Sequence, residues 1–112
     1  MNLHFAKQMF PKQFNYKIVN LDTLETVFSH NLRNVIPQDL WKNKLVNLCY
    51  TDDNVVHFTI TSETESNSEV LVDDLIDIIV DDNYKLMNDK TDKPQHVNHV
   101  DIKDGTFLIY FK

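Results

Sequence analysis

Glu63–Asp82, with the sequence ETESNSEVLVDDLIDIIVDD, concentrates the negative charge of the chain and carries its longest apolar periodicity. With residues placed about 100° apart around a helix axis, one broad stripe collects Leu71, Val72, Leu75, Ile76, Ile78 and Ile79. The opposite face collects Glu69, Asp73, Asp74, Asp77 and Asp81. Ser66, with Glu69 three residues later, matches a capping box at the start of a helix.

A buried strand is the alternative for this stretch, because its content of β-branched residues is high. The run is too long for one strand and lacks the alternation of period two that a half-buried strand shows. We therefore predict one long acidic helix. Like charges then meet at i,i+4 in three pairs, Glu69/Asp73, Asp73/Asp77 and Asp77/Asp81, at a total cost of about 1 kcal/mol.

Charge is divided unevenly along the 112 residues, whose formal net charge is −6. Residues 1–44 carry six Lys or Arg and three acids, residues 45–82 carry ten acids and no Lys or Arg, and residues 83–112 carry five Lys and four acids. An acidic middle disfavours nucleic acid as a direct partner, because that binding needs neutralised phosphates. The pattern favours a basic protein surface as the partner.

The length predicts a single domain, residues 1–112, with a core of its own. No apolar run approaches the ~20 residues of a membrane span, and the first ten residues lack the apolar core of a signal peptide. Cys49 is the only cysteine, so no internal disulfide forms. These features predict a cytoplasmic protein without membrane association.

Alternating apolar residues predict three hairpins. The first joins 14–21 to 24–28, and the second joins 45–51 to 55–61 through the loop 52–54. Its expected pairs are Tyr50/Val56, Leu48/Phe58 and Val46/Ile60. The third hairpin has Asp104-Gly105 as a two-residue type I′ turn, with the expected pairs Ile102/Phe107 and Val100/Ile109.

Other segments are less regular. Pro37 suits the first turn of a helix of about two turns that carries Trp41, and Trp41 is most simply a packing residue. The first thirteen residues fit either a short helix ending before Pro11 or a loosely packed arm. We read 83–95 as a loop. The predicted order is ββαββαββ, an α+β domain with a single antiparallel sheet of about six strands and the long acidic helix packed on it.

Catalytic and cofactor motifs are not found. The chain has one glycine, Gly105, which excludes a phosphate-binding glycine loop. Cys49 and His57 share a face of the second hairpin, but an unreactive strand cysteine explains them better. His96, His99 and Asp101 are the best metal candidates, although their spacing does not place all three on one face of a strand. We therefore predict no enzyme activity, no cofactor and no metal.

The acidic stretch predicts a binding protein. The expected protein-binding residues are Glu63, Glu65, Glu69, Asp73, Asp74, Asp77, Asp81 and Asp82. On a continuous helix, five acids from Glu69 to Asp81 would span about 18 Å, or one charge per roughly 4.5 Å. One DNA strand carries a charge per roughly 3.4 Å, so the helix would imitate nucleic acid.

In charge, size and a low-GC coding bias, the chain resembles small acidic phage proteins that block host nucleases, repair enzymes or CRISPR effectors. The resemblance implies an inhibitor, including an anti-CRISPR role, that binds a basic nucleic-acid-binding protein such as a nuclease. Two alternatives remain open. One is a structural or assembly subunit, with a homodimer possible through a hairpin edge. The other is a small ligand- or metal-binding domain that uses the His-bearing C-terminal strand.

Overall fold

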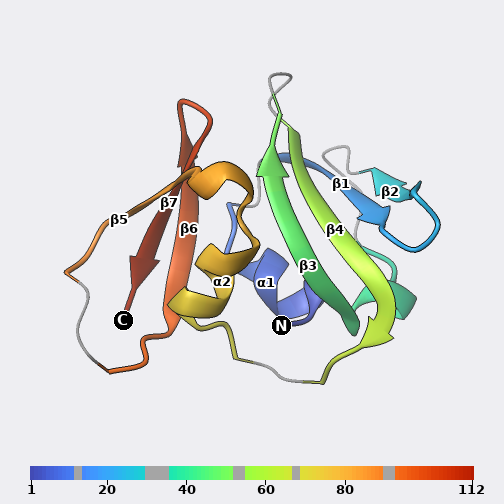
Figure 1. Ribbon diagram of the computed structural model, residues 1–112, viewed down its shortest axis with the longest axis horizontal. Coiled ribbons are helices and arrows are strands. Elements are labelled where there is room, and N and C mark those ends of the chain that lie inside the picture. Colours follow the sequence, from blue (N-terminus) through green and yellow to red (C-terminus); the bar gives the residue numbers. More distant parts are fainter. Residues whose placement is uncertain (12–13, 30–35, 52–54, 67–68, 90–92) are drawn as a thin grey trace.

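The computed structural model describes residues 1–11, 14–29, 36–51, 55–66, 69–89 and 93–112 (Figure 1). In chain order the elements are α1 (Leu3–Gln8), β1 (Asn15–Asn20), β2 (Glu25–Ser29), the 3₁₀ helix η1 (Gln38–Leu40), β3 (Asn43–Tyr50), β4 (Val55–Thr64), α2 (Val72–Ile78), the 3₁₀ helix η2 (Val80–Asp82), β5 (Tyr84–Leu86), β6 (Val97–Lys103) and β7 (Thr106–Phe111). No helix within these ranges is long and apolar enough to cross a bilayer.

Seven strands in the described ranges form two sheets: a large sheet in the order β2-β1-β4-β3 and a small sheet in the order β5-β7-β6. β1 runs parallel to β4, and β5 runs parallel to β7. The predicted single antiparallel sheet is therefore wrong, and so is the α+β class, because the fold is mostly β. Alternation and turn residues indicate local hairpins, whereas these parallel pairs join segments far apart in the chain.

The predicted long helix is also wrong, because α2 covers only Val72–Ile78. Leu71 occupies the N-cap position without a side-chain hydrogen bond, so Ser66 and Glu69 form no capping box at this helix. At the other end, Ile79 has extended backbone with ψ of 122° and stops the helix. Glu69 and Asp81 consequently lie outside α2.

Tertiary pairing explains why the helix is short. Before α2, the Val97 N–H donates to the Val70 carbonyl at 2.9 Å, and the Val72 N–H donates to the Gln95 carbonyl at 2.9 Å. After α2, Ile79 forms a parallel bridge with Leu48 of β3. The flanking residues are mostly β-branched and have modest helix propensity. Strand-like contacts at both ends therefore replace the outer helical turns.

Two hairpins follow their predicted registers closely. In β6–β7, Ile102 pairs with Phe107, and Asp104 and Gly105 have φ of 53° and 75°, as a type I′ turn requires. In β3–β4, the predicted pairs Tyr50/Val56 and Leu48/Phe58 are confirmed. The third expected pair is wrong, because the register shifts between Leu45 and Asn47 and Leu45 takes the place opposite Ile60. The predicted loop 52–54 lies outside the described residues.

The segments with irregular sequence patterns contain short helices and a short strand. The first residues form the helix α1, whose Leu3 and Ala6 are buried, so they are not a loose arm. The predicted two-turn helix after Pro37 is the single 3₁₀ turn η1. The expected loop 83–95 contains β5, which lies at an edge of the small sheet.

Phe10 connects the cores of the two sheets. Its ring meets Phe58 of β4 edge-on at 5.3 Å between centroids, and Phe107 of β7 at 5.8 Å. The Val100 N–H of β6 also donates to the Met9 carbonyl at 2.6 Å. In Figure 1, α1 and α2 lie between the two sheets. The segment that ends α1 therefore fixes one sheet against the other.

Candidate functional site

Seven of the eight predicted binding residues are exposed. Glu63 lies near the end of β4, Asp73 and Asp74 occupy the first turn of α2, and Asp77 lies near its end. Glu69 precedes α2, and Asp81 and Asp82 belong to η2. We refer to residues 69–82 as the acidic segment. In Figure 1 it passes in front of the molecule, between the small sheet and β3.

Glu65 differs from the other seven acids. Its carboxylate Oε2 lies 2.6 Å from the Met1 ammonium group, and its side chain is only 33% exposed. Its backbone N–H donates to the Lys42 carbonyl at 2.7 Å, and its carbonyl accepts the Asn2 amide at 2.9 Å. Glu65 therefore joins three segments of the chain, which is a structural role.

The end of the acidic segment has an unusual backbone. Asp81 and Asp82 have φ of 59° and 51°, in the left-handed region. This region costs a residue with a Cβ atom roughly 1–2 kcal/mol, although Asp tolerates it better than most. Asp77 lies in the last turn of α2, where the helix dipole disfavours negative charge, and Asp81 and Asp82 follow within four residues of the helix end. Neither the backbone nor the charges of this turn favour stability.

The length of α2 does not allow the expected charge spacing. Seven helical residues span about 10 Å at 1.5 Å each. Of the three expected like-charge pairs, only Asp73/Asp77 lies within the helix. The acids therefore form no regular row that matches the phosphates of a DNA strand.

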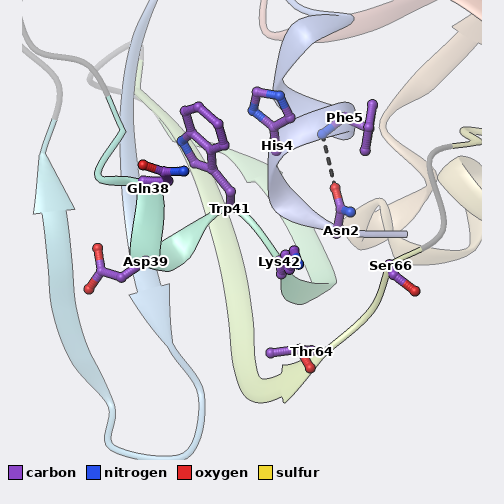
Figure 2. Close-up of a pocket in the computed structure, with 9 residues that line it drawn as sticks. All are labelled: Asn2, His4, Phe5, Gln38, Asp39, Trp41, Lys42, Thr64 and Ser66. Carbon is purple, nitrogen blue, oxygen red and sulfur yellow. Dashed lines mark hydrogen bonds between the residues drawn. The ribbon is translucent and has the colours of Figure 1, made fainter.

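A second surface feature is a groove of about 610 Å³, shown in Figure 2. We call it the aromatic groove. Its lining comprises Asn2, His4, Phe5, Gln38, Asp39, Trp41, Lys42, Thr64 and Ser66. Such a volume lies within the range of small-molecule sites, about 300–1,000 Å³. Three segments meet there: the start of α1, the η1 turn with the residues after it, and the end of β4.

Hydrogen bonds hold the walls of the aromatic groove together. Asn2 is buried, and its Oδ1 accepts the Phe5 N–H at 3.0 Å, which caps α1. The His4 N–H donates to the Trp41 carbonyl at 3.1 Å, and the Leu45 N–H donates to the Met1 carbonyl at 3.0 Å. The groove is therefore built into the fold.

Aromatic rings form one side of the groove. The His4 ring stacks on Trp41 with centroids 4.2 Å apart and planes 17° apart, and it meets Phe5 edge-on at 5.2 Å. The Trp41 indole N–H donates to the Ile36 carbonyl at 3.0 Å, which fixes the indole ring. Both rings of the stack are half-buried, so part of each contacts solvent.

Cys49 and His57 lie opposite each other in the β3–β4 ladder, but burial raises the pKa of the Cys49 thiol, which disfavours the nucleophilic thiolate. His99 stacks on Tyr110 with centroids 4.4 Å apart. In the part of the chain that the structure describes, no three side chains of His, Cys, Asp or Glu are grouped as metal ligands.

Sequence reasoning missed the aromatic groove because its walls come from segments far apart in the chain. No periodicity or spacing links Asn2 and His4 to Trp41 or Thr64. The single tryptophan was the one available signal, and a packing residue was the simpler interpretation. Trp41 does pack on His4 while it also lines the groove.

No known protein-family model matches the chain, and no solved structure matches it. The chain is similar to leucine-rich repeat and WD repeat-containing protein 1 of Xenopus tropicalis, with 35% identity over 80 residues. That match covers 71% of this chain and 11% of the frog protein, so the chain spans about a tenth of its length. These findings give no support to the expected inhibitor role or phage origin.

Proposed function

We propose that the chain is a non-catalytic protein-binding domain whose acidic segment binds a basic surface of a partner protein. That surface would carry Lys and Arg side chains, which are the groups with which nucleic-acid-binding proteins contact phosphates. The lone cysteine, Cys49, suits a reducing compartment, and we place the interaction in the cytoplasm.

One observation carries the proposal: Asp77, Asp81 and Asp82 are exposed and form no ion pair with any other described residue. Asp77 lies in the last turn of α2, where the helix dipole disfavours negative charge, and Asp81 and Asp82 follow it with left-handed backbone. A lysine in the last turn would serve the fold better. The presence of three carboxylates there is therefore better explained by a partner than by stability.

At the β2 edge, the assembly alternative receives little support. β2 ends the large sheet, and no other described strand pairs with its outer edge. However, the β1–β2 register shifts between Val19 and Ile18, so Val27 is an extra residue in β2. A bulge and an exposed charge such as Glu25 are features that protect sheet edges from pairing. This edge is therefore poorly suited to a second copy.

An affinity capture with matched baits tests the proposed function. The test bait carries D77N/D81N/D82N, and the control bait carries E25Q/D89N/D101N, at three exposed acids outside the acidic segment. Each triple change raises the formal net charge from −6 to −3. The two baits therefore differ in where charge is removed and not in how much.

We expect the wild-type and control baits to retain a basic nucleic-acid-binding protein at low salt and to release it at high salt. The D77N/D81N/D82N bait should lose that protein at both salt concentrations. Mass spectrometry of the retained proteins gives the readout. Equal retention by all three baits would contradict the proposal, as would the absence of any enriched basic protein.

A further inference from the structure

The aromatic groove combines an apolar wall with one cation. Lys42 is exposed and forms no ion pair with another described residue. Figure 2 shows Lys42 between the His4–Trp41 stack and Thr64, in the middle of the lining residues. The Asp39 carboxylate lies at the edge of the same view and is directed away from Lys42. The groove therefore presents a positive charge beside flat aromatic surface, in a chain whose net charge is −6.

Three of the other polar side chains that line the groove are able to donate hydrogen bonds. Gln38 carries an amide NH₂, and Thr64 and Ser66 carry hydroxyl groups. Asn2 is committed to the fold, because its side chain already bonds Phe5 and Glu65. A ligand with a negatively charged acceptor group would satisfy Lys42 and these donors, and a flat apolar body would cover the rings.

We propose that the aromatic groove binds a small aromatic carboxylate. The ring of the ligand packs against the His4–Trp41 stack, and its carboxylate contacts the Lys42 ammonium group. A single lysine and no phosphate-binding loop make a nucleotide a poorer fit, since phosphates need several donors. The proposal is independent of the acidic segment, so neither binding site requires the other.

Trp41 supplies a direct probe, because it is the only tryptophan of the chain and lines the groove. Phenylacetate is titrated while the fluorescence of Trp41 is recorded. Phenylacetamide has the same ring without charge, and phenethylamine carries the opposite charge. We expect saturable quenching by phenylacetate, at least fivefold weaker binding of the amide, and no saturable response to the amine.

Two lysine variants separate specific contact from general charge. K42Q should weaken phenylacetate binding on the order of tenfold, the loss expected for one charge-assisted hydrogen bond. K44Q removes the same charge two residues away, on an exposed β3 residue that does not line the groove, and should leave binding unchanged. Circular dichroism of both variants shows whether they fold like the wild type.

Acetyl-glycyl-phenylalanine distinguishes the source of the carboxylate. Tighter binding of this peptide than of phenylacetate indicates the C-terminal residue of a polypeptide, and weaker binding indicates a free small molecule. No saturable response to either carboxylate up to 10 mM (about −2.7 kcal/mol) would overturn the proposal. Equal weakening by K42Q and K44Q would also overturn it, as would equal binding of phenethylamine.

Discussion

The two α-helices among the described residues are stabilised in different ways. α1 has a side-chain cap from Asn2 and places Lys7 in its last turn, where the dipole favours a cation. α2 has no side-chain cap and no basic residue in its last turn. It keeps its place through buried Val72 and Leu75. The helix beside the aromatic groove thus satisfies its own ends, whereas the helix of the acidic segment depends on tertiary packing and is helped by Asp73 and Asp74 in its first turn but not by Asp77 near its end.

The residues around the two helices differ in how far the fold accounts for them. Contacts within the fold account for the residues around α1. The aromatic groove results from those contacts, and a ligand can occupy it. Local interactions around α2 leave Asp77, Asp81 and Asp82 unexplained. Charges that the fold does not need are the better candidates for a protein partner.

The largest expected effect concerns Phe10, which follows α1 and contacts both sheets. Phe10→Ala should lower the free energy of unfolding by about 3–5 kcal/mol, because it leaves a cavity between Phe58 and Phe107. Phe28→Ala, at a half-buried position of the edge strand β2, should cost less than half as much. Urea denaturation measures both. Equal losses would show that Phe10 does not connect the sheets.

The next largest loss of stability is expected when the side-chain cap of α1 is removed. Asn2→Ala removes the acceptor for the Phe5 N–H and the donor to the Glu65 carbonyl, and should cost about 1–2 kcal/mol. Ser66→Ala, at an exposed position on the groove, should change stability by less than about 0.5 kcal/mol. Thermal unfolding compares the two variants. If Asn2→Ala is as stable as Ser66→Ala, the two helices do not differ in capping as described.

A smaller loss of stability is expected at the β6–β7 turn. Gly105 has φ of 75°, and an added Cβ would lie 3.6 Å from Tyr50 Cδ1, which is ordinary contact. Gly105→Ala should therefore cost about 1 kcal/mol from backbone conformation alone. Chemical denaturation measures that cost. A loss above about 3 kcal/mol would mean that Tyr50 cannot accommodate the methyl group.

The smallest expected effect concerns Asp22, whose carboxylate has hydrogen-bond partners, in contrast, among the described residues, to Asp77, Asp81 and Asp82. The Asp22 carboxylate accepts the Ser62 N–H at 2.8 Å and bonds its hydroxyl, and these contacts lower the pKa of Asp22 below its usual 3.8. A lowered folded pKa gives stability that is present above pH 3.8 and disappears as pH falls through the folded pKa. Asp22→Asn should therefore lose less stability than the wild type on acidification. Identical acid profiles would contradict this role of Asp22.

Local features were predictable from the sequence, and pairing between distant segments was not. The Asp104-Gly105 turn and the Leu48/Phe58 register follow from turn residues and alternation. The parallel pairing of β1 with β4 depends on contacts across more than thirty residues, which no local pattern indicates. The end of α2 at Ile79 depends on its bridge to Leu48. The aromatic groove was missed for the same reason, because His4 and Trp41 meet only in the fold.

We infer that the acids at the end of α2 do not stabilise the fold. The most direct test of this inference is the free energy of unfolding of D77N/D81N/D82N against wild type, from urea denaturation at low and at high salt. We predict that the triple variant is more stable by about 1 kcal/mol at low salt and that the difference shrinks at high salt. A triple variant that is less stable than wild type at low salt would contradict this inference, because those carboxylates would then stabilise the fold.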